Sequence, residues 1–220
     1  MSENLELVQL LIDQGANPNS PGAHSGGLTA LEAAVDTRNT RLVQTLLAAG
    51  AEANSASSGL TSLQRAAQNG DNDLICLLLD HGADINWRAA DFGGLTALQA
   101  AADCGHYQTV QLLLANGADV NAPASWMGGR TALQAAARGG YLHMAEVLLK
   151  NGASVDAPGD RTALGEAAKN GRIDMLKLLL NAGADITSDL GRSQLERALG
   201  YATSEGHDAA AKFLKYHQIF

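Results

Sequence analysis

The sequence predicts an all-α solenoid in which short helix–turn–helix units stack in a row. A Thr-Ala-Leu tripeptide or a close variant recurs every 31 to 35 residues, and a Gly-Ala pair follows it in phase. The tripeptide copies begin at Thr29, Thr61, Thr96, Thr131, Thr162 and, in degenerate form, Ser193. The chain contains 40 alanines and 33 leucines among 220 residues, but only 4% aromatic residues. So few large rings favour thin repeated layers over a single large core.

The sequence pattern of each unit predicts two short helices, and neither helix is expected to be stable in isolation. In the central unit, Thr96 is a helix cap and the alanine-rich run behind it is a strong helix former. Gly105 ends this helix. Val110 and Leu113 then mark the apolar stripe of a second helix, which Gly117 ends. Because neither helix buries its stripe alone, neighbouring units must stack.

The same unit carries the motifs of a known family. Residues 96–102 read Thr-Ala-Leu-Gln-Ala-Ala-Ala, Gly105-His106 follows, and residues 113–121 read Leu-Leu-Ala-Asn-Gly-Ala-Asp-Val-Asn. In this form the unit resembles the ankyrin repeat, and the Ala-Leu-Gln-Ala-Ala variant resembles arrays of filamentous-fungal proteins. The family's proline and histidine are replaced, here by Ala97 and Gln99. The resemblance implies β-hairpin-like connecting loops and a concave face that binds other proteins.

The repeat phase divides the chain into one array of about six repeats, taken as a single domain over 1–220. Residues 1–20 are an N-terminal half repeat that contains only a second helix. The last unit has an extra turn at 200–203 and an amphipathic segment at 211–216, typical of a capping repeat with a wettable outer face. The predicted repeats are 21–54, 55–86, 87–121, 122–156 and 157–187, and the cap is 188–220.

The charge is uneven along the chain. Residues 1–129 carry 4 basic and 13 acidic side chains, net −9, whereas residues 130–220 carry 11 and 10, net +1. The overall charge of −8 argues against nucleic acid as the main ligand, and the acidic first half favours a basic partner. No run of eighteen apolar residues is present, and residues 1–6 lack the basic region and apolar stretch expected of a secretion signal. Cys76 and Cys104 are too few for a disulfide framework. We therefore expect a cytoplasmic or nuclear monomer that crosses no membrane.

Three lengthened turns hold most of the unusual side chains. Aromatic residues on loops otherwise made of Gly, Ala and Ser are hard to justify by solubility, and such residues dominate interface hot spots. The alternative is that each ring folds back onto its own turn or the adjacent helix. The candidates are the tip residues His24, Asp91, Phe92, Trp126 and Met127, with Trp87 at the base of its turn.

In each repeat unit, the residues of the first helix that face the predicted concave side suggest a second part of the site. Alanines at 33, 100 and 135 predict a hollow floor, and Asp36 and Asp103 border it. A hollow with aromatic walls and carboxylates would suit a cationic side chain. Arg65 and Arg138 lie on the same predicted face. A merely solvated face is the alternative.

These features predict a non-catalytic module that binds a protein or peptide through its concave face and turn tips. The alternative is a small stand-alone enzyme or small-molecule-binding protein that uses a concave pocket. A closed pocket under the long turns would favour the alternative, and an open groove would favour recognition. No metal-ligand spacing, phosphate loop or Gly-x-Ser-x-Gly elbow is present, so the sequence predicts neither cofactor nor catalytic residues.

Overall fold

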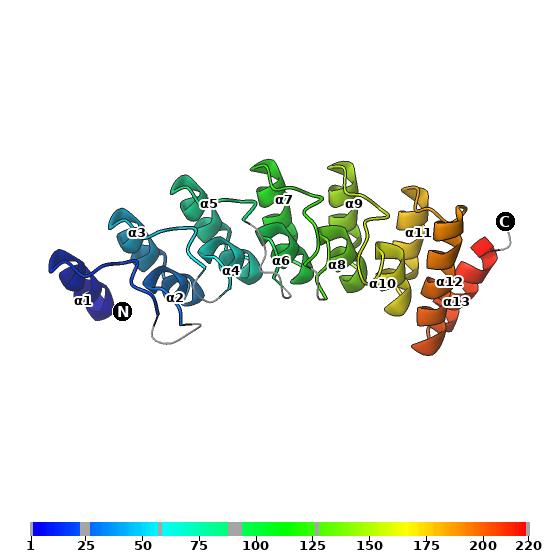
Figure 1. The fold of residues 1–220 in the computed structure, drawn as a ribbon, viewed down its shortest axis with the longest axis horizontal. Coiled ribbons are helices and arrows are strands. Elements are labelled where there is room, and N and C mark those ends of the chain that lie inside the picture. Colours follow the sequence, from blue (N-terminus) through cyan, green and yellow to red (C-terminus); the bar gives the residue numbers. More distant parts are fainter. Residues whose placement is uncertain (1, 23–26, 57–58, 88–93, 126–127, 219–220) are drawn as a thin grey trace.

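The computed structural model describes residues 2–22, 27–56, 59–87, 94–125 and 128–218. Within these ranges the chain forms thirteen helices and no strand, arranged as an elongated stack (Figure 1). The all-α solenoid predicted from the repeats is therefore confirmed. The connecting turns form no β-ladder within the described part of the chain.

The helices lie in two rows. The inner row consists of α2 (Ala30–Asp36), α4 (Ser62–Asn69), α6 (Ala97–Asp103), α8 (Ala132–Gly139), α10 (Ala163–Lys169) and α12 (Asp189–Ser204). The outer row consists of α1 (Ser2–Asp13), α3 (Thr40–Ala48), α5 (Asn72–Asp80), α7 (Tyr107–Ala115), α9 (Leu142–Lys150), α11 (Ile173–Asn181) and α13 (Asp208–Gln218). Figure 1 shows the stack arched, with the inner row on the hollow side.

The arch follows from the residues that pack in each row. Inner helices meet through fully buried alanines such as Ala101, Ala136 and Ala167, so they approach one another closely. Outer helices contribute larger side chains, including the fully buried Leu113 and Leu148, and contact one another less extensively. The helices of the inner row are therefore more closely spaced than the helices of the outer row, and this difference bends the stack toward the inner row.

The repeated threonines begin the inner helices as predicted. The hydroxyls of Thr29, Thr61, Thr96 and Thr131 each accept a hydrogen bond from the backbone N–H three residues later. In return, the Glu or Gln at that position accepts a bond from the threonine backbone N–H, which completes a capping box. Thr162 caps α10 without this reciprocal bond, because Gly165 has no side chain.

Glycines with positive φ end most helices of both rows, although Arg38 takes this position after α2. At the inner helices these glycines also make room for the next repeat. Gly105 has a φ of +78°, a conformation that side chains rarely adopt. A Cβ atom there would lie 2.7 Å from the ring of Tyr141, which packs over the backbone of the preceding repeat. His106 packs over Gly70 in the same way, and its Nε2 lies 2.8 Å from the carbonyl oxygen of Gln68. The histidine therefore has a structural role.

An asparagine in each early turn joins two repeats. Asn121 donates from Nδ2 to the Gly152 carbonyl at 2.9 Å, and its Oδ1 accepts from the Ser154 N–H at 2.8 Å. The same two bonds are made by Asn19, Asn54 and Asn86. In the last turn of this series the residue is Asp156, whose carboxylate accepts from the Asp185 N–H but has no N–H to donate.

The C-terminal repeat differs from the sequence prediction at its start. Ser193 does not cap α12; the helix begins one turn earlier, where the Ser188 hydroxyl accepts from the Gly191 N–H. Ser188 also bonds to the Asp185 carboxylate, so the turn and the cap form one unit. The predicted extra turn at 200–203 is present, and α13 packs on α12 with Leu214 buried and Lys212 exposed. No helix in the described ranges is long and apolar enough to span a membrane.

Candidate interaction site

Most of the proposed tip residues cannot be placed. His24, Asp91, Phe92, Trp126 and Met127 lie outside the described residues. Trp87, at the base of its turn, is described, and 37% of its surface is exposed. Its aromatic ring is therefore only partly covered by the repeat that carries it.

The four charged candidates on the inner row form two separate ion pairs. Arg65 on α4 lies 2.8 Å from the Asp36 carboxylate at the end of α2. Arg138 on α8 lies 3.3 Å from the Asp103 carboxylate at the end of α6, with 48% and 32% of the two side chains exposed. Each pair joins neighbouring repeats, so the carboxylates expected to stand open to a cation already face an arginine.

The predicted hollow floor is not open. Ala100 and Ala135 are 1% and 2% exposed, and only Ala33 of the three alanines is partly accessible. The expectation of a hollow was wrong at these two positions because their methyl groups fill the close packing of neighbouring inner helices.

Farther along the inner row, a buried carboxylate holds two arginines. Glu166 on α10 accepts hydrogen bonds through Oε1 from the Nε atoms of Arg130 and Arg161, both at 3.1 Å. The glutamate side chain is 4% exposed, whereas about a quarter of each arginine reaches solvent. One negative charge is thus shared between two positive charges, and the cluster keeps a positive excess.

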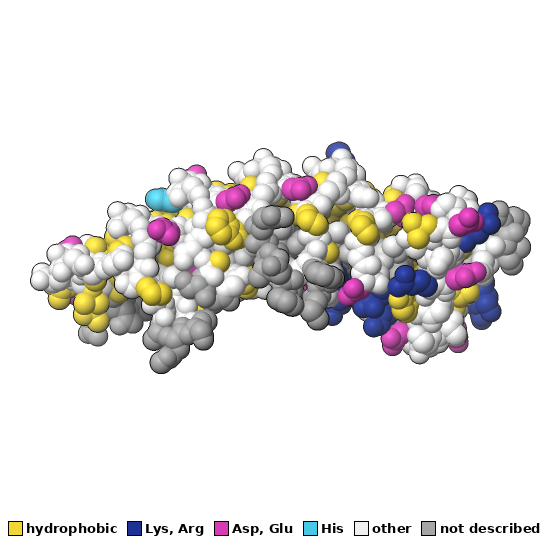
Figure 2. Space-filling view, in the orientation of Figure 1, with side chains coloured by type: hydrophobic (Ala, Val, Ile, Leu, Met, Phe, Trp, Pro, Cys, Tyr) yellow, Lys and Arg dark blue, Asp and Glu magenta, His cyan; other side chains and the backbone are white. Residues whose placement is uncertain are grey.

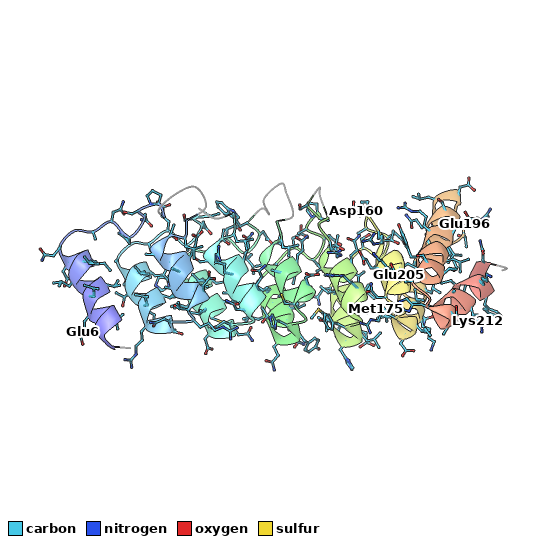
Figure 3. All side chains as sticks on the ribbon, turned by 90° about the horizontal axis from the view of Figure 1, so that it is seen from below. Glu6, Asp160, Met175, Glu196, Glu205 and Lys212 are labelled. Atoms are coloured by element: carbon cyan, nitrogen blue, oxygen red, sulfur yellow. The ribbon has the colours of Figure 1, made fainter. Side chains whose placement is uncertain are left out.

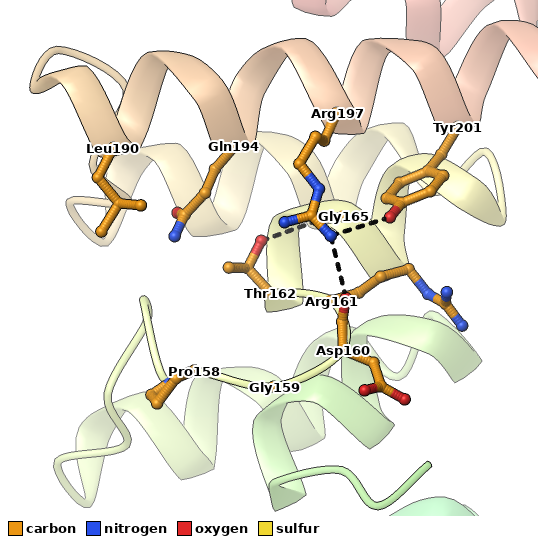
Figure 4. Close-up of a pocket in the computed structure, with 10 residues that line it drawn as sticks. All are labelled: Pro158, Gly159, Asp160, Arg161, Thr162, Gly165, Leu190, Gln194, Arg197 and Tyr201. Atoms are coloured by element: carbon orange, nitrogen blue, oxygen red, sulfur yellow. Dashed lines mark hydrogen bonds between the residues drawn. The ribbon is translucent and has the colours of Figure 1, made fainter. Parts of the chain in front are cut away.

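Next to this cluster, a cleft of about 190 Å³ separates the 158–162 turn from α12. Figure 4 shows Leu190, Gln194, Arg197 and Tyr201 along one face of α12, opposite the turn. The Arg197 guanidinium reaches across and donates to the Asp160 carbonyl and to the Tyr201 hydroxyl, both at 3.4 Å. In Figure 3, the cleft lies between the labelled Asp160 and Glu196, at the C-terminal end of the row of turns.

The electrostatics of the cleft follow from its arginines. The hydrogen bond from Arg197 lowers the pKa of Tyr201 from its ordinary value. Burial would lower the pKa of Arg161, but the charge and hydrogen bond of Glu166 outweigh it and raise that pKa. The Arg161 guanidinium also lies 5.6 Å from the centre of the Tyr201 ring, a cation–π distance. Guanidinium groups carry a positive charge and only donate hydrogen bonds, so the cleft offers donors to a negative group.

The sequence motifs alone did not indicate this cleft, although one signal was present. Gly165 stands where the four preceding inner helices carry Glu32, Gln64, Gln99 or Gln134. Gln134 spans to the next turn and donates to the carbonyls of Ala157 and Pro158, at 2.8 and 3.4 Å. Gln99 makes the equivalent bonds one repeat earlier. The missing side chain at Gly165 leaves the corresponding space open, and Gly165 lines the cleft.

The surface reflects the charge difference between the two halves. Figure 2 shows lysines and arginines gathered over the C-terminal helices, whereas the N-terminal part of this face shows acidic and apolar side chains. This distribution matches the net charges of −9 and +1 in the sequence. The described residues contain no group of three or more His, Cys, Asp and Glu that could hold a metal ion.

Comparison with known proteins supplies the family. No curated protein matches the chain. A family model of ankyrin repeats, three copies long, matches residues 1–89, 39–124 and 123–190. These matches span most of the chain, and they agree with the stacked helix pairs, the threonine caps and the glycine ends described above. The chain therefore belongs to the ankyrin repeat family.

Proposed function

We propose that this protein is a non-catalytic recognition module whose protein partner lies along the inner row and the adjacent turns. Ankyrin repeats are generally protein–protein interaction modules and typically non-enzymatic scaffolds. The observation that supports this surface is the series of partly exposed ion pairs that cross between inner helices. Its members are Asp36–Arg65, Asp103–Arg138 and Lys169–Glu205.

In an exposed ion pair, either charged group can leave its partner within the protein and pair with a group of a bound protein instead. The two more exposed pairs, Asp103–Arg138 and Lys169–Glu205, each contribute only about 0–1 kcal/mol to folding, because water screens the charges and ordering the side chains costs entropy. A partner can therefore separate Asp103 from Arg138 and engage either group at small cost to the stack. The inner helices beneath are held by buried alanines and capping boxes, so the surface keeps its shape.

The charge of the first half favours a basic partner. With a net charge of −9 over residues 1–129, the N-terminal repeats attract cationic segments before contact. Such attraction is screened beyond about 8 Å at physiological ionic strength. We expect the association rate of a purified partner to fall between 50 and 300 mM salt (chosen conditions, over which the Debye length roughly halves). A rate that does not change with salt would contradict a basic partner.

Site-specific photo-crosslinking tests the proposed surface. A photoreactive amino acid replaces Arg138 on the inner row or, as the matched control, Glu146 on the exposed side of α9 in the same repeat. In an extract of the native source, we expect a discrete crosslinked product from position 138 and none from position 146. Crosslinking from position 146 alone, or equally from both, would contradict the inner-row assignment.

The turn tips extend the proposed surface. Phe92 and Trp126 remain candidate anchors on sequence grounds, and each change to alanine should weaken partner binding by about 2 kcal/mol or more if they insert into the partner. The free energy of unfolding, followed by thermal melting, should change by no more than about 0.5 kcal/mol, since exposed substitutions rarely affect folding. Destabilised variants with intact affinity would show that the rings pack within the protein instead.

A further inference from the structure

The cleft between the 158–162 turn and α12 lies at a junction where one bridging side chain is missing. At the two preceding junctions, Gln99 and Gln134 bridge from an inner helix to a carbonyl of the next turn. At α10 the equivalent residue is Gly165, and the space above it is the cleft. A Cβ atom on Gly165 would meet Arg161, Thr162 and Tyr201 only at 3.5–3.6 Å, which is ordinary contact. The backbone there would therefore accept a side chain.

Two side chains of the cleft wall, Arg197 and Tyr201, present hydrogen-bond donors that lack strong acceptors. Among the described residues, no carboxylate lies within 4.0 Å of Arg197, and its two bonds at 3.4 Å are long. Charged guanidinium groups form their strongest bonds with carboxylates, in a planar two-point geometry. The Tyr201 hydroxyl accepts from Arg197, so its own hydrogen remains available for donation. Figure 4 shows the Asp160 carboxylate pointing away from Arg197.

The size of the cleft restricts what can enter. Small-molecule and cofactor sites usually enclose about 300–1,000 Å³. A volume of about 190 Å³ suits one short side chain that projects from a larger molecule. Leu190 stands exposed at the end of the cleft, where it can contact the apolar atoms of such a segment.

We infer that this cleft binds a carboxylate side chain, aspartate or glutamate, of a protein partner. The inference rests on the proposed function, because it names one chemical feature of the partner's sequence. One partner would then be bound through two opposite charges. The acidic N-terminal repeats would bind a basic segment, and this positive cleft would bind an acidic residue near α12. A partner with both features would bind the stack in a single direction.

Peptide titration tests the cleft without knowledge of the partner. The probe is a tetrapeptide with two central glutamates and blocked ends. The comparison peptides are its glutamine counterpart and a blocked-amine glycine tetrapeptide with a free terminal carboxylate. Nuclear magnetic resonance follows the Nε–H signals of the arginines, and we expect only the glutamate peptide to shift the Arg197 and Arg161 signals. Equal shifts from the glutamine peptide would overturn the inference, and shifts from the glycine peptide alone would overturn its assignment to a side chain.

Three variants locate the binding. Arg197→Gln should weaken glutamate-peptide binding about tenfold or more, because it removes a charged donor. Gly165→Gln keeps every charge but places in the cleft the side chain that Gln134 carries one repeat earlier, and we expect a similar loss. Arg192→Gln, the matched control on the same helix, should change affinity by less than about twofold, because this arginine lines a separate hollow beside His217 and not the cleft. Unchanged binding to Gly165→Gln would overturn the cleft as the site.

The outcome is separable from that of the proposed function. Loss of the peptide effect with intact crosslinking at position 138 would reject only the acidic-residue site. Peptide binding without crosslinking at position 138 would instead reject the inner-row surface and leave the cleft assigned.

Discussion

The α8–α10 junction and the α10–α12 junction are built on the same plan, but they differ in two polar side chains. At the first, Gln134 spans to the 157–158 carbonyls, and Asn121 bonds to both sides of the next turn. At the second, Gly165 replaces the glutamine and Asp156 replaces the asparagine. Both junctions are hollowed beside their turns, but only the hollow at the second junction is lined by arginines and includes the helix position that lost its glutamine.

The difference shows which interactions are needed for stacking and which are optional. The leucine and alanine layers continue through both junctions, with Leu148, Leu179 and Ala167 all fully buried. Only the polar links across the turns change. A repeat can therefore lose its bridging side chains and still stack, and the open space becomes available for a ligand.

The largest expected effect tests whether the apolar layers are equivalent. Leu148→Ala and Leu179→Ala each remove a fully buried side chain and should each cost about 2–5 kcal/mol of unfolding free energy. Chemical denaturation measures both. A cost at position 179 that is much smaller than at position 148 would show that the last junction is loosely packed, contrary to the comparison.

A smaller effect distinguishes the buried charge cluster from the exposed pair. Glu166→Gln should destabilise the fold by about 1–3 kcal/mol, because two partly buried arginines lose their charged partner. The control, Asp103→Asn, should cost no more than about 1 kcal/mol, since its pair with Arg138 is open to water. Equal costs in denaturant titrations would contradict the distinction.

The turn link can be repaired. Asp156→Asn supplies the missing N–H and should let residue 156 donate to the Gly183 carbonyl, as Asn121 does to Gly152. We expect a gain of about 0.5–1.5 kcal/mol, the usual contribution of one hydrogen bond. The reverse change, Asn121→Asp, should destabilise by a similar amount. A gain in both variants, or a loss in both, would mean that the asparagine links do not set junction stability.

The smallest expected effect is on the stability of the fold at acidic pH. Hydrogen bonds from the Ser188 hydroxyl, and from the backbone of Ser188 and Thr187, lower the pKa of Asp185 to about 2. Because the folded pKa lies below the ordinary value of 3.8, the ionised form stabilises the fold above about pH 4. This contribution is lost as the pH falls toward 2. In melting curves, Asp185→Asn should flatten the loss of stability between pH 4 and 2; an unchanged acid profile would contradict the role of this turn.

The repetitive parts of the molecule could be predicted from the sequence, whereas the site could be predicted only in part. Threonine caps, terminal glycines and buried leucines recur in phase, so each copy supports the others. The pairing of Asp103 with Arg138 could not be read from the sequence, because it depends on how neighbouring helices are placed. The cleft depends on what Gly165 lacks, and on Ser188 starting α12 earlier than Ser193 suggested. A departure from the repeat pattern, such as Gly165, is visible in the sequence. Its structural consequence can be recognised only when the position of the neighbouring repeat is known.

The most direct test of this account is the exchange of the two residues that distinguish the junctions. Gln134→Gly should destabilise the protein by about 2 kcal/mol or more, because it removes a capping box, a bridge to Ala157 and helix propensity. Gly165→Gln should stabilise it by about 1 kcal/mol, since a Cβ fits there and the capping box can form. Denaturant titration of both variants should give changes of opposite sign. Destabilisation by Gly165→Gln would contradict the claim that this junction only lacks a side chain.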